Sequence, residues 1–257
     1  MVAFKMVRGG AIAAVFALAS SVVAIAADDP PELFGGKLVG SLTGISDYMY
    51  RGISQTQDGP ALQGSIDYSH SLPIPGMEAY IGAWASSVRF GTASLETDVV
   101  GGLRGTVGDS KFGYDLGFIW YTYPGADNRS TYEFWEWGGL VNYDFDVVKP
   151  YAGARWSQDF FGGSGKATYG FVGFTAPVPG GLPLSPRIAG QIGKQKVEKN
   201  AVYGVPDYTD YMVGLTLTAF TLDWTLQYID TNIKKPQCSG GTDACQGRVV
   251  LGATKAF

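Results

Sequence analysis

The sequence predicts an all-β protein, a transmembrane antiparallel up-and-down β-barrel of about 12 strands (roughly 10–14 possible). Three observations predict it. Hydrophobic and polar residues alternate along most segments of the chain, aromatic residues gather near the segment ends, and mostly long connections alternate with mostly short ones. Alternation alone would also fit a soluble β-sandwich, but a sandwich gives no reason for connections that alternate in length.

The composition agrees with a sheet that has one face in an apolar medium. The 257 residues are 46% hydrophobic, 14% aromatic and only 16% charged, with 37 glycines and one histidine. The formal charge is −4 and basic residues form no dense cluster, so we expect no nucleic acid partner. Beyond the N-terminus no apolar run approaches the ~18 residues of a spanning helix, so strands must make any membrane crossing.

The N-terminus predicts export. Lys5 and Arg8 precede an apolar run over residues 11–19, and Ala24 and Ala26 occupy the small-residue positions before a cleavage point. We therefore expect a secretory signal peptide over residues 1–26 and a barrel domain over residues 27–257. An N-terminal anchor helix is the alternative, although the apolar run is shorter than the ~20 residues that a spanning helix needs.

Residues 46–70 predict the first β-hairpin. In its second arm Leu62, Ile66 and Tyr68 share the apolar face, while the polar residues take the other face. In the first arm we expect Tyr48 and Tyr50 to share the apolar face and mark the outer rim. Arg51, just beyond them, either pairs with an acidic residue at the mouth or fixes the first loop.

The remaining segments follow in order. Residues 77–89 place Tyr80, Trp84 and Val88 on the expected apolar face, and residues 111–123 alternate most clearly, with Leu116 among the apolar residues opposite Asp115. Two segments, residues 147–157 and 168–176, are less regular. The expected strands are residues 37–50, 61–69, 77–89, 95–105, 111–123, 132–145, 147–157, 168–176, 185–195, 210–219, 221–230 and 247–257.

The connections and aromatics orient the barrel. Long connections should lie outside the cell and short turns in the periplasm; residues 90–94 are an exception, because this connection is short where a long one is expected. Two aromatic belts are expected at the membrane interfaces. The chain ends on Phe257, an aromatic residue typical of strands that the outer-membrane assembly machinery recognises, with Lys255 in place of the usual apolar residue two positions back.

Residues 46–70, SDYMYRGISQTQDGPALQGSIDYSH, resemble the opening of the TorF family of bacterial outer-membrane porins. Further similarities are GYDLGFIWYTYPG at 113–125 and YGVPDYTDYMVGLT at 203–216. The resemblance covers most of residues 27–257. It implies a pore in the outer membrane, without a substrate and without catalytic residues.

The polar phase of each strand supplies the candidate lumen residues. Charged residues that face a lumen tune which solutes pass, and here the acidic residues favour cations slightly. The predicted lumen-lining residues are Asp47, Asp67, Arg89, Glu96, Asp98, Arg104, Asp115, Glu136, Arg155, Arg187, Asp210, Asp223 and Arg248. These charges could instead pair across a narrow lumen and seal it, because about twelve strands lie between filled and open barrels.

Other chemistry finds little support. Cys238 and Cys245 lie close together in a polar loop, and export makes a disulfide the expected state. Two thiols without a nearby histidine are only half of a usual zinc site. A lipase-like site would need a base beside a serine, and the single histidine, His70, lies at a strand end in phase with the apolar face. We therefore expect no catalytic residues, no metal and no cofactor.

The sequence thus predicts an outer-membrane porin for passive diffusion of small hydrophilic solutes or ions. Its expected partners are outer-membrane lipid, the assembly machinery through the C-terminal strand, and small solutes. A plugged barrel with a structural or surface-interaction role is the alternative, and a soluble exported sandwich is a third possibility.

Overall fold

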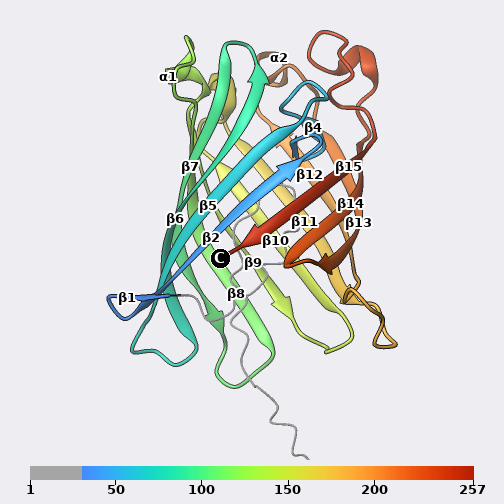
Figure 1. Ribbon diagram of the computed structural model, residues 1–257. Coiled ribbons are helices and arrows are strands. Elements are labelled where there is room, and N and C mark those ends of the chain that lie inside the picture. The colour runs from blue at the N-terminus through green and yellow to red at the C-terminus, as the bar shows by residue number, and fades with distance from the viewer. Residues whose placement is uncertain (1–30) are drawn as a thin grey trace, which may run out of the picture.

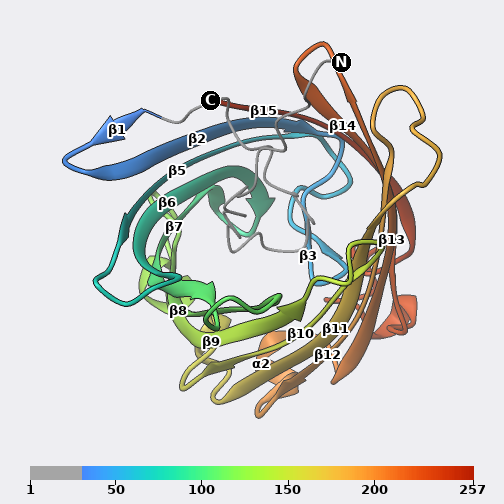
Figure 2. The same ribbon diagram turned by 90° about the horizontal axis from the view of Figure 1, so that it is seen from below.

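A computed structural model describes residues 31–257 as a closed antiparallel barrel of twelve strands (Figures 1 and 2). The predicted signal peptide, residues 1–26, lies outside the described residues. The barrel strands are β2 (Gly36–Ile45), β5 (Ala61–Ser71), β6 (Met77–Phe90), β7 (Ala93–Thr106), β8 (Phe112–Thr122), β9 (Phe134–Tyr143), β10 (Lys149–Ser157), β11 (Ala167–Pro177), β12 (Arg187–Val197), β13 (Tyr208–Ala219), β14 (Leu222–Thr231) and β15 (Arg248–Ala256). Each strand pairs with its neighbours in the chain, and β15 pairs with β2 to close the ring.

The predicted strand count is confirmed, including the two irregular segments. These became β10 and β11, which pair over nine residues from Lys149↔Thr175 to Ser157↔Ala167. Their sequence signal is weak because glycine and alanine occupy both faces. Closure of the barrel favours strand formation in these two segments even though their alternation is weak. In a closed barrel, every strand forms backbone hydrogen bonds with a neighbour on each side.

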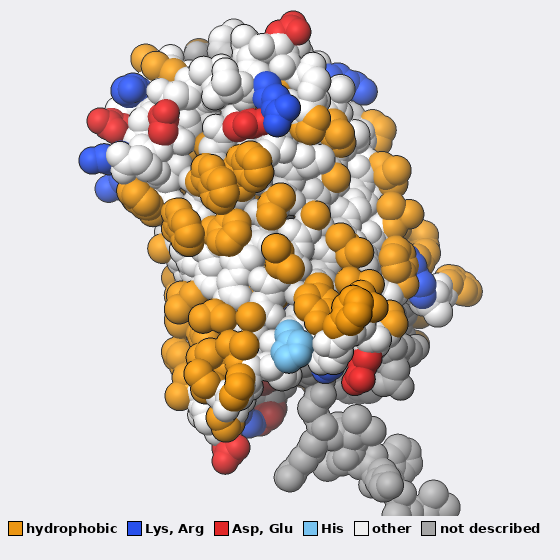
Figure 3. Space-filling view, turned by 90° about the vertical axis from the view of Figure 1, so that its left-hand side faces the viewer, with side chains coloured by type: hydrophobic (Ala, Val, Ile, Leu, Met, Phe, Trp, Pro, Cys, Tyr) orange, Lys and Arg blue, Asp and Glu red, His pale blue; other side chains and the backbone are white. Residues whose placement is uncertain are grey.

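The alternating pattern sorts side chains between the outer and inner faces of the barrel. In β8, Leu116 is 57% exposed while Asp115 and Tyr121 are each 1% exposed. Figure 3 shows the result on one face of the barrel, where hydrophobic side chains are spread over the wall and most charged side chains lie toward its upper and lower ends. Large apolar side chains exposed on most strands suit the outer face to lipid, and the closed ring of strands excludes a sandwich.

The two ends of the barrel differ as the connections predict. The upper end in Figure 1 carries the longer loops, with the short helices α1 (Arg129–Tyr132) and α2 (Asn200–Tyr203) and the 3₁₀ turns η1 (Phe161–Gly163) and η2 (Lys235–Gln237). We call this the outer end. The short connection between β6 and β7 also lies there; these two strands are the longest, at 14 residues each, so the hairpin itself extends the wall. No helix within residues 31–257 is both long and apolar enough to span a membrane.

Two predictions about which way aromatic residues face are wrong. Tyr48 and Tyr50 are buried inside the barrel rather than at a lipid-facing rim. In β6, Tyr80, Trp84 and Val88 also face inward. Both phases of β6 are apolar, so alternation alone could not distinguish them. The smaller residues of the other phase of β6, such as Ala83, face lipid. The inward-facing rings of Tyr80 and Trp84 contact Asp115 and Tyr48 within the lumen.

Elsewhere the predicted aromatic surface holds. Trp135 and Trp137 of β9 are exposed on the outer face near the outer end, and Tyr143 and Phe145 are exposed near the other end. Trp120 stacks on Trp135 with ring centroids 5.1 Å apart. Aromatic side chains at these two levels suit the interfaces of a bilayer, where one part of the ring is apolar and the other wet.

Candidate functional site: the lumen and its inner loop

The connection from β2 to β5 folds into the barrel instead of outward. Residues 46–60, which we call the inner loop, contain two short paired strands, β3 (Met49–Tyr50) and β4 (Ile53–Ser54), and Figure 2 shows β3 within the ring of strands. The turn between them needs left-handed backbone at Arg51 (φ 48°) and Gly52 (φ 82°). A side chain at position 52 would lie 2.4 Å from the Thr231 side chain, so glycine allows the loop to pass close to the end of β14.

Arg51 at the tip of the inner loop joins the loop to the far wall. Its guanidinium donates to Glu136 of β9 at 2.5 Å and to Gln195 of β12 at 2.6 Å. It also lies over the rings of Tyr169 (4.2 Å) and Tyr50 (4.7 Å). Planar guanidinium suits such combined pairing and stacking. Arg51 therefore both pairs with an acidic residue and fixes the loop, so the two roles considered for it occur together.

Asp47 holds the base of the inner loop. One carboxylate oxygen accepts hydrogen bonds from the hydroxyls of Ser54 and Thr56, each at 2.7 Å. The other oxygen accepts from Arg248 of β15 at 2.8 Å. Arg248 also pairs with Asp58 on the return arm of the loop. Both arms are therefore tied to the same wall strand.

Tyr48 reaches the neighbouring wall. Its hydroxyl donates to Glu96 of β7 at 2.8 Å, and its ring lies 5.3 Å from that of Trp84. Asp98, two residues along β7 on the same inner face, is 1% exposed, and neither of its carboxylate oxygens has a hydrogen-bond partner among the described residues. Glu96 and Asp98 therefore lie side by side on the inner wall.

Charged pairs also line the inner wall toward the short-turn end. Arg104 of β7 donates to Asp67 of β5 at 2.9 Å and to Glu78 of β6 at 2.5 Å. Arg187 of β12 pairs with Asp223 of β14 at 2.5 Å. These pairs leave the inner wall strongly polar below the inner loop.

The predicted lumen residues occupy three kinds of position. Ten are buried on the inner side of the barrel wall or at the base of the inner loop: Asp47, Asp67, Glu96, Asp98, Arg104, Asp115, Glu136, Arg155, Asp210 and Asp223. Arg187 and Arg248 are half-buried and paired with acidic residues. Arg89 is exposed and lies at the outer mouth, beside a register irregularity near the end of β6.

Several contributors to the lumen carry no charge, and a search for charges misses them. Gln195 accepts from Arg51, Tyr169 donates to Asp210 at 3.0 Å, and Tyr80 donates to Asp115 at 2.8 Å. Strand phase is the signal that would have found Gln195, since it follows Gln191 at the spacing of one strand face.

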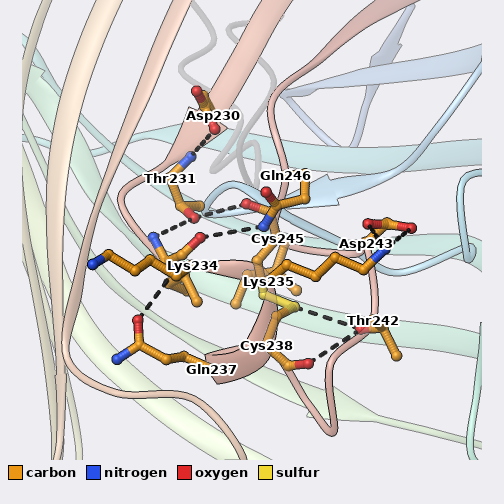
Figure 4. Close-up of a disulfide and its surroundings, with 12 residues drawn as sticks. Asp230, Thr231, Lys234, Lys235, Gln237, Cys238, Thr242, Asp243, Cys245 and Gln246 are labelled. Atoms are coloured by element: carbon orange, nitrogen blue, oxygen red, sulfur yellow. Dashed lines mark hydrogen bonds and ion pairs between the residues drawn. A yellow bond between two sulfur atoms is a disulfide. The ribbon is translucent and has the colours of Figure 1, made fainter.

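The predicted disulfide between Cys238 and Cys245 is confirmed. It closes the loop between β14 and β15 at the outer end, and both cysteines are fully buried (Figure 4). The hydroxyl of Thr231 donates to the carbonyl of Cys245 at 2.8 Å. The amide of Ser54 donates to the carbonyl of Ala244 at 2.8 Å, so the disulfide loop also supports the inner loop.

A cavity opens at each end of the barrel. The outer cavity, about 530 Å³, is lined by residues of the inner loop, by aromatic residues near the outer end and by Glu96. The lower cavity, about 660 Å³, is lined by residues that include Arg104 and Asp115. The two share no lining residue, and Arg51 and Glu136 line neither. The tip of the inner loop therefore lies between the two cavities.

Two further side chains bear on the chemistry. Burial beside Phe160 raises the pKa of Tyr203, at the outer mouth, to about 12, so this phenol stays neutral. His70 is exposed at the short-turn end of β5, where its Nδ1 lies 2.8 Å from the carbonyl oxygen of Ser71. No serine hydroxyl is hydrogen-bonded to this ring among the described residues.

Known structures share the fold. The NanC porin matches with a TM-score of 0.53 and 9% identity, over 84% of this chain and 98% of that chain. The COG4313 outer membrane channel from Pseudomonas putida F1 matches with a TM-score of 0.49 and 11% identity, over 91% and 100%. LpxR from Salmonella typhimurium matches with a TM-score of 0.45 and 11% identity, over 85% and 99%. Of these three likenesses, the one to NanC has a TM-score above 0.5, and at 9% identity it concerns the fold alone.

The strand topology and the lipid-suited outer face identify a transmembrane β-barrel, and the likeness to the NanC porin concerns the same fold. No curated protein matches the chain. Residues 35–257 match the family described as bacterial proteins of unknown function (Gcw_chp), and the chain belongs to that family.

Proposed function

We propose that the protein is an outer-membrane channel through which small hydrophilic solutes or ions diffuse passively, with the inner loop as its constriction. The observation that carries this proposal is the polar inner wall. A barrel that served only as a scaffold could be filled with apolar side chains, as small barrels are, whereas this one lines its interior with acidic residues, arginines and glutamines on most strands. The resemblance to the TorF porins supports the same function.

The charges support a preference for cations. Of the ten predicted lumen residues that are buried, eight are acidic and two are basic. Arg51 adds one further buried positive charge. A lumen with excess negative charge attracts cations and repels anions through its local field.

Lipid on the outer face and the assembly machinery are the partners we propose. The last strand alternates outward Val249 and Leu251 with inward Val250, and Phe257 closes it with its backbone amide bonded to the carbonyl of Gly40 at 3.0 Å. An aromatic C-terminus on such a strand suits recognition during insertion. We propose no enzymatic role.

Conductance of the folded protein in a planar bilayer tests the proposal. We expect discrete single-channel steps and a reversal potential in a salt gradient that indicates cation preference. Folding is checked separately by heat-modifiable migration in gels. Folded protein that neither conducts nor admits solutes into liposomes would overturn the proposal.

A second function is favoured by one observation. Arg51 bridges the lumen from the inner loop to β9 and β12, and a bridge that never opens would make the protein a closed barrel whose outer loops bind a partner. Absence of conductance in both the wild type and an Arg51→Ala variant would favour this function.

A further inference from the structure

The outer cavity combines apolar walls with a carboxylate. Seven aromatic residues from several segments of the chain line it: Tyr50, Phe90, Tyr123, Phe134, Phe160, Phe161 and Tyr203. The rings pack against one another, for example Phe90 against Phe161 at 5.6 Å and Phe134 against Phe160 at 4.7 Å. These contacts fix the walls in the absence of a ligand. A volume of about 530 Å³ is within the range of small-molecule sites.

Glu96 is the buried charge in this cavity. It is 2% exposed and accepts from the Tyr48 hydroxyl at 2.8 Å. The other two acidic lining residues, Asp58 and Asp243, are exposed and already paired with Arg248 and Lys235. Glu96 is therefore buried and bonded to a neutral hydroxyl, whereas Asp58 and Asp243 are exposed and paired with basic side chains.

No basic side chain neutralises Glu96. Within residues 31–257 neither Glu96 nor Asp98 forms a salt bridge, and Asp98 keeps both oxygens unpartnered. The third nearby acid, Glu136, is paired with Arg51. Buried carboxylates are normally paired or hydrogen-bonded in full, whereas these two acidic side chains behind the cavity have no basic partner within residues 31–257.

The lining selects between classes of ligand. A bare metal ion needs several ligands held close together, and no group of three or more His, Cys, Asp or Glu side chains that could hold one occurs within residues 31–257. An anion would meet the field of Glu96 and Asp98, with Arg89 the one basic residue among those lining the cavity, exposed at its rim. Aromatic rings do attract organic cations through their negative faces while also contacting their alkyl groups.

We propose that the outer cavity binds a small organic ammonium ion, with the cationic group toward Glu96 and the alkyl groups against the aromatic walls. Binding itself does not require that the channel conduct. That the bound cation is a transported solute rests on the proposed function. Absence of conductance would therefore contradict the proposed channel function, and absence of binding would contradict the proposed cation site.

The test is isothermal titration calorimetry of the full folded protein in detergent, with choline as the probe. The matched comparison is 3,3-dimethylbutan-1-ol, which has the shape of choline with carbon in place of the charged nitrogen. We expect saturable binding of choline, at least ten-fold tighter than that of the neutral alcohol. Equal affinities, preference for the alcohol, or no saturable binding of choline to folded protein would each overturn the proposal.

Variants assign the binding to this cavity. Glu96→Gln retains an acceptor for Tyr48, and we expect it to weaken choline at least ten-fold without changing the affinity for the alcohol. Phe161→Leu shortens one wall at the half-buried edge of the cavity and should weaken choline several-fold even if the Glu96 variant fails to fold. Asp109→Asn removes an exposed acid at the short-turn end and should change nothing. Equal effects of Asp109→Asn and Phe161→Leu would overturn the assignment.

Discussion

Replacement of Arg51 by alanine should destabilise the barrel and release the inner loop. The side chain is 5% exposed, pairs with Glu136 at 2.5 Å, donates to Gln195 at 2.6 Å and covers two tyrosine rings. Removing one partner of a buried ion pair typically costs about 3–5 kcal/mol, because the other charge is left uncompensated. We therefore expect the free energy of unfolding to fall by about 3–5 kcal/mol.

The same change should increase conductance. Without the Arg51 anchor on β9 and β12, the inner loop keeps its ties at Asp47, Tyr48, Ser54 and Asp58. We expect its tip to move and the constriction to widen. Thermal unfolding followed by circular dichroism and by heat-modifiable gel migration measures the stability, and single-channel recording measures the conductance.

Two controls make the result specific. In the double variant Arg51→Ala with Glu136→Gln, the loss should be smaller than the sum of the single losses, because no buried charge is left unpaired. Arg129→Ala removes an exposed arginine that pairs with Glu133 four residues on, and should change stability by no more than about 0.5 kcal/mol. If Arg51→Ala alters stability and conductance no more than Arg129→Ala, the bridge has no role.

Three other predictions address the fold. Mass spectrometry after alkylation should show Cys238 and Cys245 modified only after reduction, and the Cys238→Ser variant should be cleaved by added protease in the outer loop faster than the wild type, with an apparent loss of about 2–3 kcal/mol. Gly52→Ala should lower the thermal midpoint and destabilise by about 1–3 kcal/mol, because the new methyl group would meet Thr231 at a left-handed position. Leu226→Arg places a charge on the lipid face of β14 and should lower the free energy of unfolding by about 2–4 kcal/mol, measured by denaturant titration in lipid vesicles. If any of these three variants is as stable as the wild type, the environment assigned to its residue is wrong.

The barrel was predictable because its information is local. In β8 and β14 the period-two pattern alone assigns Leu116 and Leu226 to the outer face, and in each strand the polar partner phase faces inward. The pattern fails in β6, where Tyr80 and Ile81 are both apolar and only the three-dimensional partner, Asp115, distinguishes them. A tyrosine side chain has an apolar ring and a polar hydroxyl, so it can lie either at the lipid interface or in the polar lumen.

The inner loop was not predictable from periodicity. Tyr48, Tyr50 and Arg51 have the same residue types as an interfacial rim, and nothing in their spacing shows that the chain reverses inward at Gly52. Their partners lie far along the chain, at Glu96, at Glu136 and at Gln195. Closure of the barrel brings such distant residues together. The constriction can therefore be inferred only from the complete ring of strands.

The most direct test of the central claim is single-channel recording of the folded wild type and of Arg51→Ala in a salt gradient. The proposed channel predicts discrete conductance with cation preference in the wild type and larger steps in the variant. Absence of conductance from both proteins, or preference for anions, would contradict it.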